Sequence, residues 1–223
     1  MAQSKVHSYI LLDRTGSMSS IWTEALSSVN AYAGSIASDA GDIVPAITLA
    51  VFDAQDGLQF DVLRRAVTAK DWQNVTDKEA SPRGMTPLFD AIARIVAMAE
   101  ADNPDKAVIV VMTDGQENAS REVTKEGVKA ALDRVEKRGW ELVFLGAEFA
   151  NFADADAVGI ASHHSMAMSA PMMRGSMAKL ARKSQAYYQN AEANVMFDEA
   201  DREEAGEADV QKRKGTGLFK SKK

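Results

Sequence analysis

Apolar and β-branched residues gather in six short segments along the chain, each of about the length of a β-strand. Residues 107–112 form a continuous apolar run, which is typical of a strand buried on both faces of a parallel sheet. The other strands are expected at residues 6–12, 44–52, 59–66, 141–146 and 165–169. Only the turn 53–57 separates the second segment from the third, so these two are predicted to pair as an antiparallel hairpin.

Between these segments, apolar residues recur every three or four positions, which predicts amphipathic helices. Such patterns cover residues 22–36, 86–99, 124–138, 152–158 and 173–191. Pro87 suits the first turn of its helix, and Gly139 suits the residue that ends the next one. The alternation of strands and helices predicts an α/β fold with a mainly parallel sheet and helices on both faces.

The C-terminal residues differ from the rest in charge. Seven acidic residues between 198 and 209 accompany only Arg202, and six basic residues with no acidic one follow between 211 and 223. Blocks of like charge usually remain solvated. We therefore expect one domain over residues 1–194 and a charged, disordered tail over residues 195–223.

Composition narrows the possible functions. Hydrophobic residues make up 46% of the chain, and the absence of cysteine excludes disulfides, thiolate zinc sites and cysteine nucleophiles. No apolar run approaches the roughly 20 residues of a membrane span, and no secretory signal is apparent, so a cytoplasmic protein without a membrane partner is expected. The formal charge of −6 argues against nucleic acid as a partner.

Oxygen-bearing side chains follow three of the predicted strands or loops. Asp13, Thr15 and Ser17 follow the first strand, and their alternate spacing allows them to converge where the chain leaves the strand extended. Thr86 ends a Gly-containing loop, and Asp114 follows the most apolar strand. Two carboxylates and three hydroxyls form a hard oxygen set, which suits Mg²⁺ or Mn²⁺ better than zinc or copper.

These residues resemble the metal-ion-dependent adhesion site of von Willebrand factor A domains, because they occur in the same order and each follows the expected strand or loop. The matching segments are Asp13-x-Thr15-x-Ser17, Thr86 and Thr113-Asp114-Gly115. The resemblance covers roughly residues 6–189. It implies a Rossmann-like, mainly parallel six-stranded sheet in which residues 59–66 form the one antiparallel strand. One departure is that Thr15 stands where the family usually has serine, a change that keeps the hydroxyl.

The resemblance also implies roles. Thr15, Ser17 and Thr86 would bind the metal through their hydroxyls, and Asp13 and Asp114 directly or through water. A Glu or Asp of a partner protein would complete the coordination. The implied function is a non-catalytic, Mg²⁺-dependent protein–protein interaction module, similar to small stand-alone intracellular relatives in bacteria and phages.

Each site residue also has a purely structural interpretation: Asp13 could cap a turn, Thr86 could cap the helix that begins at Pro87, and Asp114-Gly115 could be an ordinary turn. Three such coincidences at adjacent strand ends are less probable than one metal site. Two other functions stay open. A metal-assisted phosphohydrolase could use Asp13 as its nucleophile, although the second aspartate of such enzymes is replaced by Thr15. A homo-oligomeric assembly component could place the acidic tail of one molecule in the metal site of another.

Two further groups of residues have an ordinary interpretation and a functional one. His163-His164 has only His7 as a further histidine, which favours a surface loop over a zinc site. Five methionines could mark an adaptable binding surface, although methionine at helical spacing more often fills a core. They are Met166, Met168, Met172, Met173 and Met177.

Overall fold

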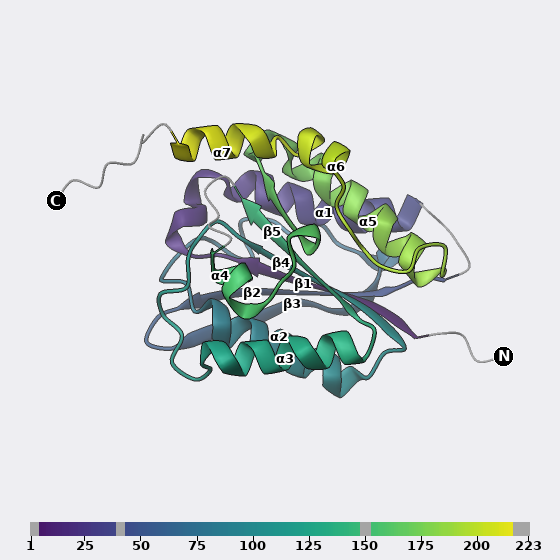
Figure 1. The fold of residues 1–223 in the computed structure, drawn as a ribbon, viewed down its shortest axis with the longest axis horizontal. Helices are drawn as coiled ribbons and strands as arrows, with labels where there is room; N and C mark the ends of the chain where they lie inside the picture. The colour runs from purple at the N-terminus through teal and green to yellow at the C-terminus, as the bar shows by residue number, and fades with distance from the viewer. Residues whose placement is uncertain (1–4, 39–42, 148–152, 216–223) are drawn as a thin grey trace.

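Six strands form a single sheet in the order β3-β2-β1-β4-β5-β6 (Figure 1). The computed structural model describes residues 5–38, 43–147 and 153–215. The strands are β1 (Val6–Asp13), β2 (Ala46–Ala54), β3 (Leu58–Thr68), β4 (Lys106–Thr113), β5 (Glu141–Ala147) and β6 (Ser165–Met168). All neighbouring pairs are parallel except β2 and β3, which run antiparallel. The predicted Rossmann-like sheet with one antiparallel strand is confirmed.

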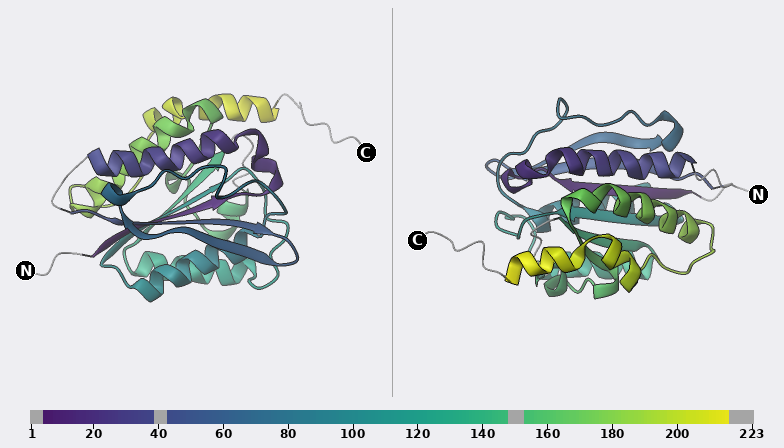
Figure 2. Two further views of the ribbon diagram at one scale, coloured as in Figure 1. Left: turned by 180° about the vertical axis from the view of Figure 1, so that it is seen from behind. Right: turned by 90° about the horizontal axis from the view of Figure 1, so that it is seen from above.

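Helices cover both faces of the sheet (Figures 1 and 2). On one face lie α1 (Trp22–Ser38) and α5 (Met173–Tyr188), and on the other lie α2 (Leu88–Asp102), α3 (Lys125–Lys137) and α4 (Ala153–Val158). Four short 3₁₀ helices complete these layers among the described residues: η1 (Gly16–Ser20), η2 (Ala69–Asp71), η3 (Ser162–His164) and η4 (Ala170–Met172). None of the helices in the described ranges is both long and apolar enough to cross a membrane.

The central strand β1 is buried on both faces. Ile10 and Leu12 pack into the core beneath α1 and α5, whereas Tyr9 and Leu11 pack into the core beneath α2 and α3. Its polar residues His7 and Ser8 are buried as well, and both form side-chain hydrogen bonds. A central strand enclosed in this way holds its carboxyl end in a fixed position.

The methionines that raised two interpretations are mostly core residues. Met166, Met168, Met173 and Met177 are almost fully buried, whereas Met172 is 45% exposed. The ordinary interpretation is therefore confirmed for four of the five. They fill the layer between the sheet, α5 and the C-terminal segment.

The prediction of a disordered tail is wrong for residues 195–215. Two helices, α6 (Glu199–Glu204) and α7 (Glu207–Gly215), lie against α5 and β6 (Figure 1). Val195, Phe197, Ala205 and Val210 are buried, which joins this segment to the main core. Residues 216–223 lie outside the described residues.

Ion pairs and a capping box explain why a highly acidic segment folds. Asp201 lies 2.7 Å from the Lys179 Nζ and 2.8 Å from the Lys183 Nζ, both on α5. Asp198 and Asp201 each accept a backbone N–H from the other, so they form a capping box at the start of α6. A charge count alone cannot reveal these partners.

Candidate metal centre

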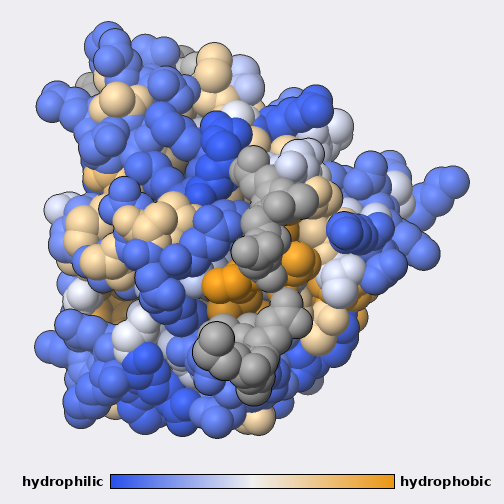
Figure 3. Space-filling view, turned by 90° about the vertical axis from the view of Figure 1, so that its right-hand side faces the viewer, coloured by the Kyte–Doolittle hydropathy of each residue, from blue (hydrophilic) through white to orange (hydrophobic). Residues whose placement is uncertain are grey.

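The five predicted site residues come together at the carboxyl ends of β1 and β4, in the middle of the sheet. From β1 the chain goes to β2 on one side, and through β3 and α2 it reaches β4 on the other side. In open α/β sheets, ligands bind at such a topological switch point. The opposite end, where the parallel strands begin, is largely hydrophilic around a small hydrophobic area (Figure 3).

Asp13 is the last residue of β1 and is fully buried. Its Oδ1 accepts the backbone N–H of Thr15 at 2.6 Å, and its Oδ2 accepts the hydroxyl of Thr113 at 2.5 Å. The carboxylate thus holds the loop after β1 against the end of β4. It can brace the site and supply negative charge to it.

Three hydroxyls and the second carboxylate form a continuous chain of short contacts. The Thr86 hydroxyl donates to Thr15 Oγ1 at 3.3 Å, and Thr15 Oγ1 lies 3.1 Å from Ser17 Oγ. Ser17 in turn donates to Asp114 Oδ1 at 2.7 Å. Ser17 is exposed, whereas Asp13, Thr15, Thr86 and Asp114 are buried, so the cluster reaches the surface at Ser17.

Burial sets the electrostatics of the two carboxyl groups. Desolvation raises the pKa of Asp13 to about 7, although the hydrogen bonds from Thr113 and Thr15 act in the opposite direction. Burial also raises the pKa of Asp114, and the hydrogen bond from Ser17 opposes that rise. A pair of carboxylates whose negative charge is disfavoured by burial is stabilised by a bound cation.

The oxygens fit a small hard cation. Within the described ranges no three His, Cys, Asp or Glu side chains form a group that could hold a metal ion, so a metal here would need the hydroxyls as well as the two carboxylates. Gly115 leaves room beside them: a Cβ at this position would lie 3.0 Å from Thr86 Oγ1 and 3.6 Å from Ser17 Oγ. All-oxygen coordination completed by water is what Mg²⁺ and Mn²⁺ prefer.

The helix-capping interpretation of Thr86 does not hold. The N-cap position of α2 is Pro87, and the first-turn N–H groups of Phe89 and Asp90 donate to Glu117 and Ser120. Thr86 instead directs its hydroxyl towards Thr15. Its backbone is fixed by Asn118, whose Oδ1 accepts the Thr86 N–H at 2.9 Å and whose own N–H donates to the Thr86 carbonyl at 3.1 Å.

Two acidic residues tie the loop after Asp114 to the start of α2. Asp90 is 3% exposed, and its carboxylate accepts the backbone N–H groups of residues 121, 122 and 123 at 2.8–3.1 Å. Glu117 accepts the N–H of Phe89 at 2.9 Å and two N–H groups of its own loop. The segments that carry Thr86 and Asp114 are therefore interlocked.

A buried ion-pair network supports the loop after β1 from the other side. Asp53, fully buried at the end of β2, accepts Arg14 Nε at 2.7 Å and Arg83 Nε at 3.1 Å. Arg14 also reaches Asp61 on β3 at 2.5 Å. Asp53 thus links the loop of Thr15 to the loop of Thr86. Breaking a buried pair of this kind typically costs about 3–5 kcal/mol.

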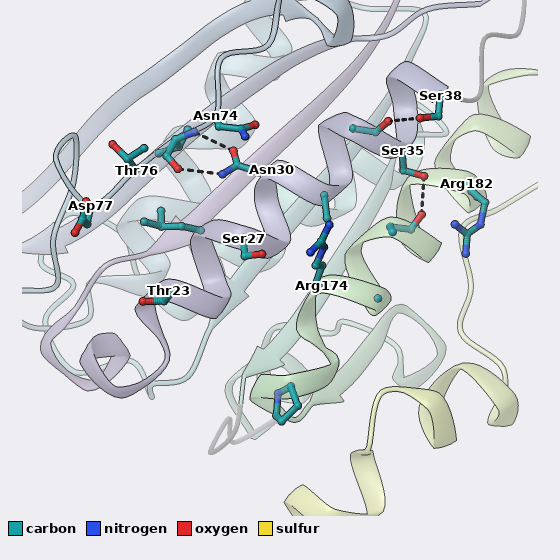
Figure 4. Close-up of a pocket in the computed structure, with 17 residues that line it drawn as sticks. Thr23, Ser27, Asn30, Ser35, Ser38, Asn74, Thr76, Asp77, Arg174 and Arg182 are labelled. Carbon is teal, nitrogen blue, oxygen red and sulfur yellow. Dashed lines mark hydrogen bonds between the residues drawn. The ribbon is translucent and has the colours of Figure 1, made fainter.

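Helix α1, which follows the first loop, is held on both sides (Figure 4). The Asn30 amide donates to the Val75 carbonyl at 3.0 Å and accepts the Val75 N–H at 2.9 Å. On the other side, Ser35 donates to the Ala178 carbonyl of α5 at 3.1 Å. Helix α1, which follows the loop of Thr15 and Ser17, is therefore anchored on both sides.

Asp53, Arg14, Asp90, Glu117 and Asn118 were not predicted from the sequence. For Asp53 a signal existed, because it is a further acidic residue at a strand end. Arg14 occupies an unspecified position of the motif, and nothing local marks its burial. Elsewhere, His164 is half-buried 3.3 Å from Glu141, and this pair belongs to no metal-binding group among the described residues.

Comparison with known proteins shows the fold. No protein-family model matches the sequence, and no curated protein matches it. Among solved structures, the pilus adhesin SpaC from Lactobacillus rhamnosus GG has a TM-score of 0.63 at 14% identity, over 82% of this chain and 31% of the adhesin. The manganese-loaded TRAP protein of Plasmodium vivax has a TM-score of 0.57 at 18% identity, over 78% and 72% of the two chains.

A von Willebrand factor type A structure from Catenulispora acidiphila has a TM-score of 0.51 at 16% identity, over 83% of this chain and 44% of that one. The present chain therefore spans only part of SpaC and of the Catenulispora protein. It has the fold of a von Willebrand factor A domain, as the sequence resemblance predicted.

Proposed function

We propose that the chain is a metal-ion-dependent protein-binding module. In this proposal Asp13, Thr15, Ser17, Thr86 and Asp114 hold Mg²⁺, and a Glu or Asp of a partner protein completes the coordination. The observation that carries it is the convergence of five side chains, all bearing oxygen, on one point that opens to the surface at Ser17.

The charge of the site supports an acidic partner. Asp13 and Asp114 together offset the two positive charges of the ion, and the three hydroxyls add no charge. With the ion bound the site is neutral, so a carboxylate that replaces a water on the ion meets no net negative charge as it approaches. The presence of manganese in the similarly folded TRAP protein is consistent with a divalent ion in this fold.

The contacts of Asp13 favour binding over hydrolysis. In the described structure its two oxygens accept hydrogen bonds from Thr113 and Thr15, and its ionic neighbour is Asp114. An aspartyl nucleophile would instead need a carboxylate oxygen that is free to attack the substrate. For the assembly alternative, Asp201 and Glu207 of the acidic segment are already paired within their own chain, whereas Glu199, Glu203 and Asp209 are exposed.

Isothermal titration of Mg²⁺ into the full chain tests the metal site. Thr86→Val keeps the shape of the side chain and removes the hydroxyl, and Asp13→Asn removes a charge. We expect either change to weaken Mg²⁺ binding by at least about tenfold. Asp56→Asn is the matched control, since Asp56 is a highly exposed carboxylate in the neighbouring β2–β3 turn. Equal binding by all four proteins, or by none, would refute the assignment.

The partner is tested separately. Immobilised wild-type chain and Asp56→Asn should capture a protein in Mg²⁺ and release it in EDTA, and Thr86→Val should capture none. A chain that binds Mg²⁺ as predicted but shows no Mg²⁺-dependent capture would contradict the binding function and leave the metal site intact.

A further inference from the structure

An exposed apolar side chain belongs to the residue that precedes Thr86 of the candidate metal centre. Among the described residues only five large hydrophobic side chains are exposed beyond a third, namely Val44, Val62, Met85, Met172 and Met196. Met85 is the most exposed of them, at 54%, and it immediately precedes Thr86. Adjacent Cα atoms lie about 3.8 Å apart, so the Met85 side chain branches from the backbone next to a residue of the oxygen cluster.

The backbone of Met85 is firmly fixed. Its N–H donates to the Ala54 carbonyl at 3.1 Å, and its carbonyl accepts the Ala54 N–H at 2.9 Å, which makes an antiparallel bridge to the end of β2. Gly84, with a φ of +70°, allows the close approach that forms this bridge. Because both backbone groups are satisfied, the Cα of Met85 is held in place next to Thr86, and the flexible side chain extends from this fixed point.

Polar residues are also exposed at this end of the sheet. Ser17 and Gln116 are exposed at the same edge, and Arg83 on the same loop is 43% exposed. A bound partner would thus meet a cation, a polar rim and one apolar contact. Methionine is flexible and polarizable, and it is common on surfaces that adapt to apolar partners.

We infer that Met85 sets part of the partner specificity: the segment that supplies the acidic residue carries a bulky apolar residue within two positions of it. In an extended peptide, neighbouring residues are about 3.3 Å apart along the chain, so a side chain one or two positions from the acid can reach Met85. This inference rests on the proposed function, because it concerns the residues next to the metal-bound carboxylate.

Selection of short peptides from a random displayed library on the full chain tests it. In saturating Mg²⁺, wild type should enrich peptides with Asp or Glu and a bulky apolar residue within two positions, and EDTA should abolish the enrichment. Met85→Ser should keep the acidic residue and lose the apolar one. Met85→Leu should behave as wild type, and so should Met172→Ser, which removes a similarly exposed methionine elsewhere.

For one selected peptide, Met85→Ser should weaken binding by about tenfold, and Mg²⁺ affinity by calorimetry should not change. Two failures are distinguishable. If no Mg²⁺-dependent acidic peptide is enriched, the proposed function fails and this inference fails with it. If acidic peptides are enriched without an apolar neighbour, or if Met85→Ser binds them as wild type does, only the role of Met85 is overturned.

Discussion

The loop before Thr86 approaches the end of β2 closely at Gly84, and replacing this glycine with alanine tests how the site is built. Gly84 has a φ of +70°, and a Cβ there would lie 2.4 Å from the Ala54 carbonyl oxygen and 3.0 Å from Asp53 Oδ2. Gly139 is the matched control. Its φ is +66°, but a Cβ at that position would meet nothing within 4 Å.

The two substitutions share one cost and differ in another. A left-handed conformation costs an L-residue about 1–2 kcal/mol, and the lower entropy of the unfolded chain offsets part of this. We therefore expect Gly139→Ala to lower the free energy of unfolding by about 1 kcal/mol. Gly84→Ala must also separate Met85 from Ala54, which loses two backbone hydrogen bonds of about 1 kcal/mol each. We therefore expect Gly84→Ala to lower the free energy of unfolding by about 3 kcal/mol in total.

Urea unfolding measures the stability difference, and calorimetry measures the affinity for Mg²⁺. Displacing residues 84–86 moves the Thr86 hydroxyl, so Gly84→Ala should weaken Mg²⁺ binding by at least about tenfold. Gly139 lies just before β5, at the opposite end of the sheet, so its substitution should leave the affinity unchanged. Equal losses of stability in the two variants, or unchanged Mg²⁺ affinity in Gly84→Ala, would refute this account of the loop.

Two further predictions concern stability. Phe197→Ala should lower the free energy of unfolding by about 3 kcal/mol, because Phe197 is only 6% exposed. Met196→Ala should lower it by under about 1 kcal/mol, because Met196 is 42% exposed. Equal small effects of the two changes in urea unfolding would instead indicate a solvated tail. Burial lowers the pKa of His7 from 6.5 to about 4, so the unfolded chain binds more protons between these values and stability falls as the pH drops from 6.5 to 4. Over this pH range the free energy of unfolding of the wild type should fall by about 3 kcal/mol more than that of His7→Gln. A difference in stability between the two proteins that does not change with pH would contradict the burial effect.

The sequence predicts the sheet well because its strands are buried on both faces. A continuous run such as residues 107–112 has no solvated face to interrupt it, and turns or glycines mark its ends. The one antiparallel pair was also predictable, since a short turn cannot support the crossover that parallel strands require. The helices followed from their spacing, with Thr124 capping α3 through the Gly127 N–H.

The five oxygen-bearing residues were predictable for a related reason. Each lies at or directly beyond the end of an element whose position the sequence already indicates. The residues that hold these five in position could not be predicted in the same way. Asp53, Arg14 and Asp90 act through contacts with residues at least 30 positions away in the sequence. The C-terminal helices were missed for the same reason, since Asp201 is neutralised by lysines of another helix.

The hydrogen-bond directions explain why hydroxyls suit this site together with only two carboxylates. A hydroxyl can offer its lone pairs to a cation only if its proton points elsewhere. Ser17 directs its proton to Asp114, and Thr86 directs its proton to Thr15. The buried carboxylate of Asp13 accepts from Thr113 and from the backbone of Thr15, which orients the loop itself. A third carboxylate in place of a hydroxyl would give the ion an excess of negative charge before a partner arrived. With two carboxylates, the excess of negative charge appears only when the partner's acid binds. The affinity of the site for that acid therefore depends on the chain supplying no third carboxylate of its own.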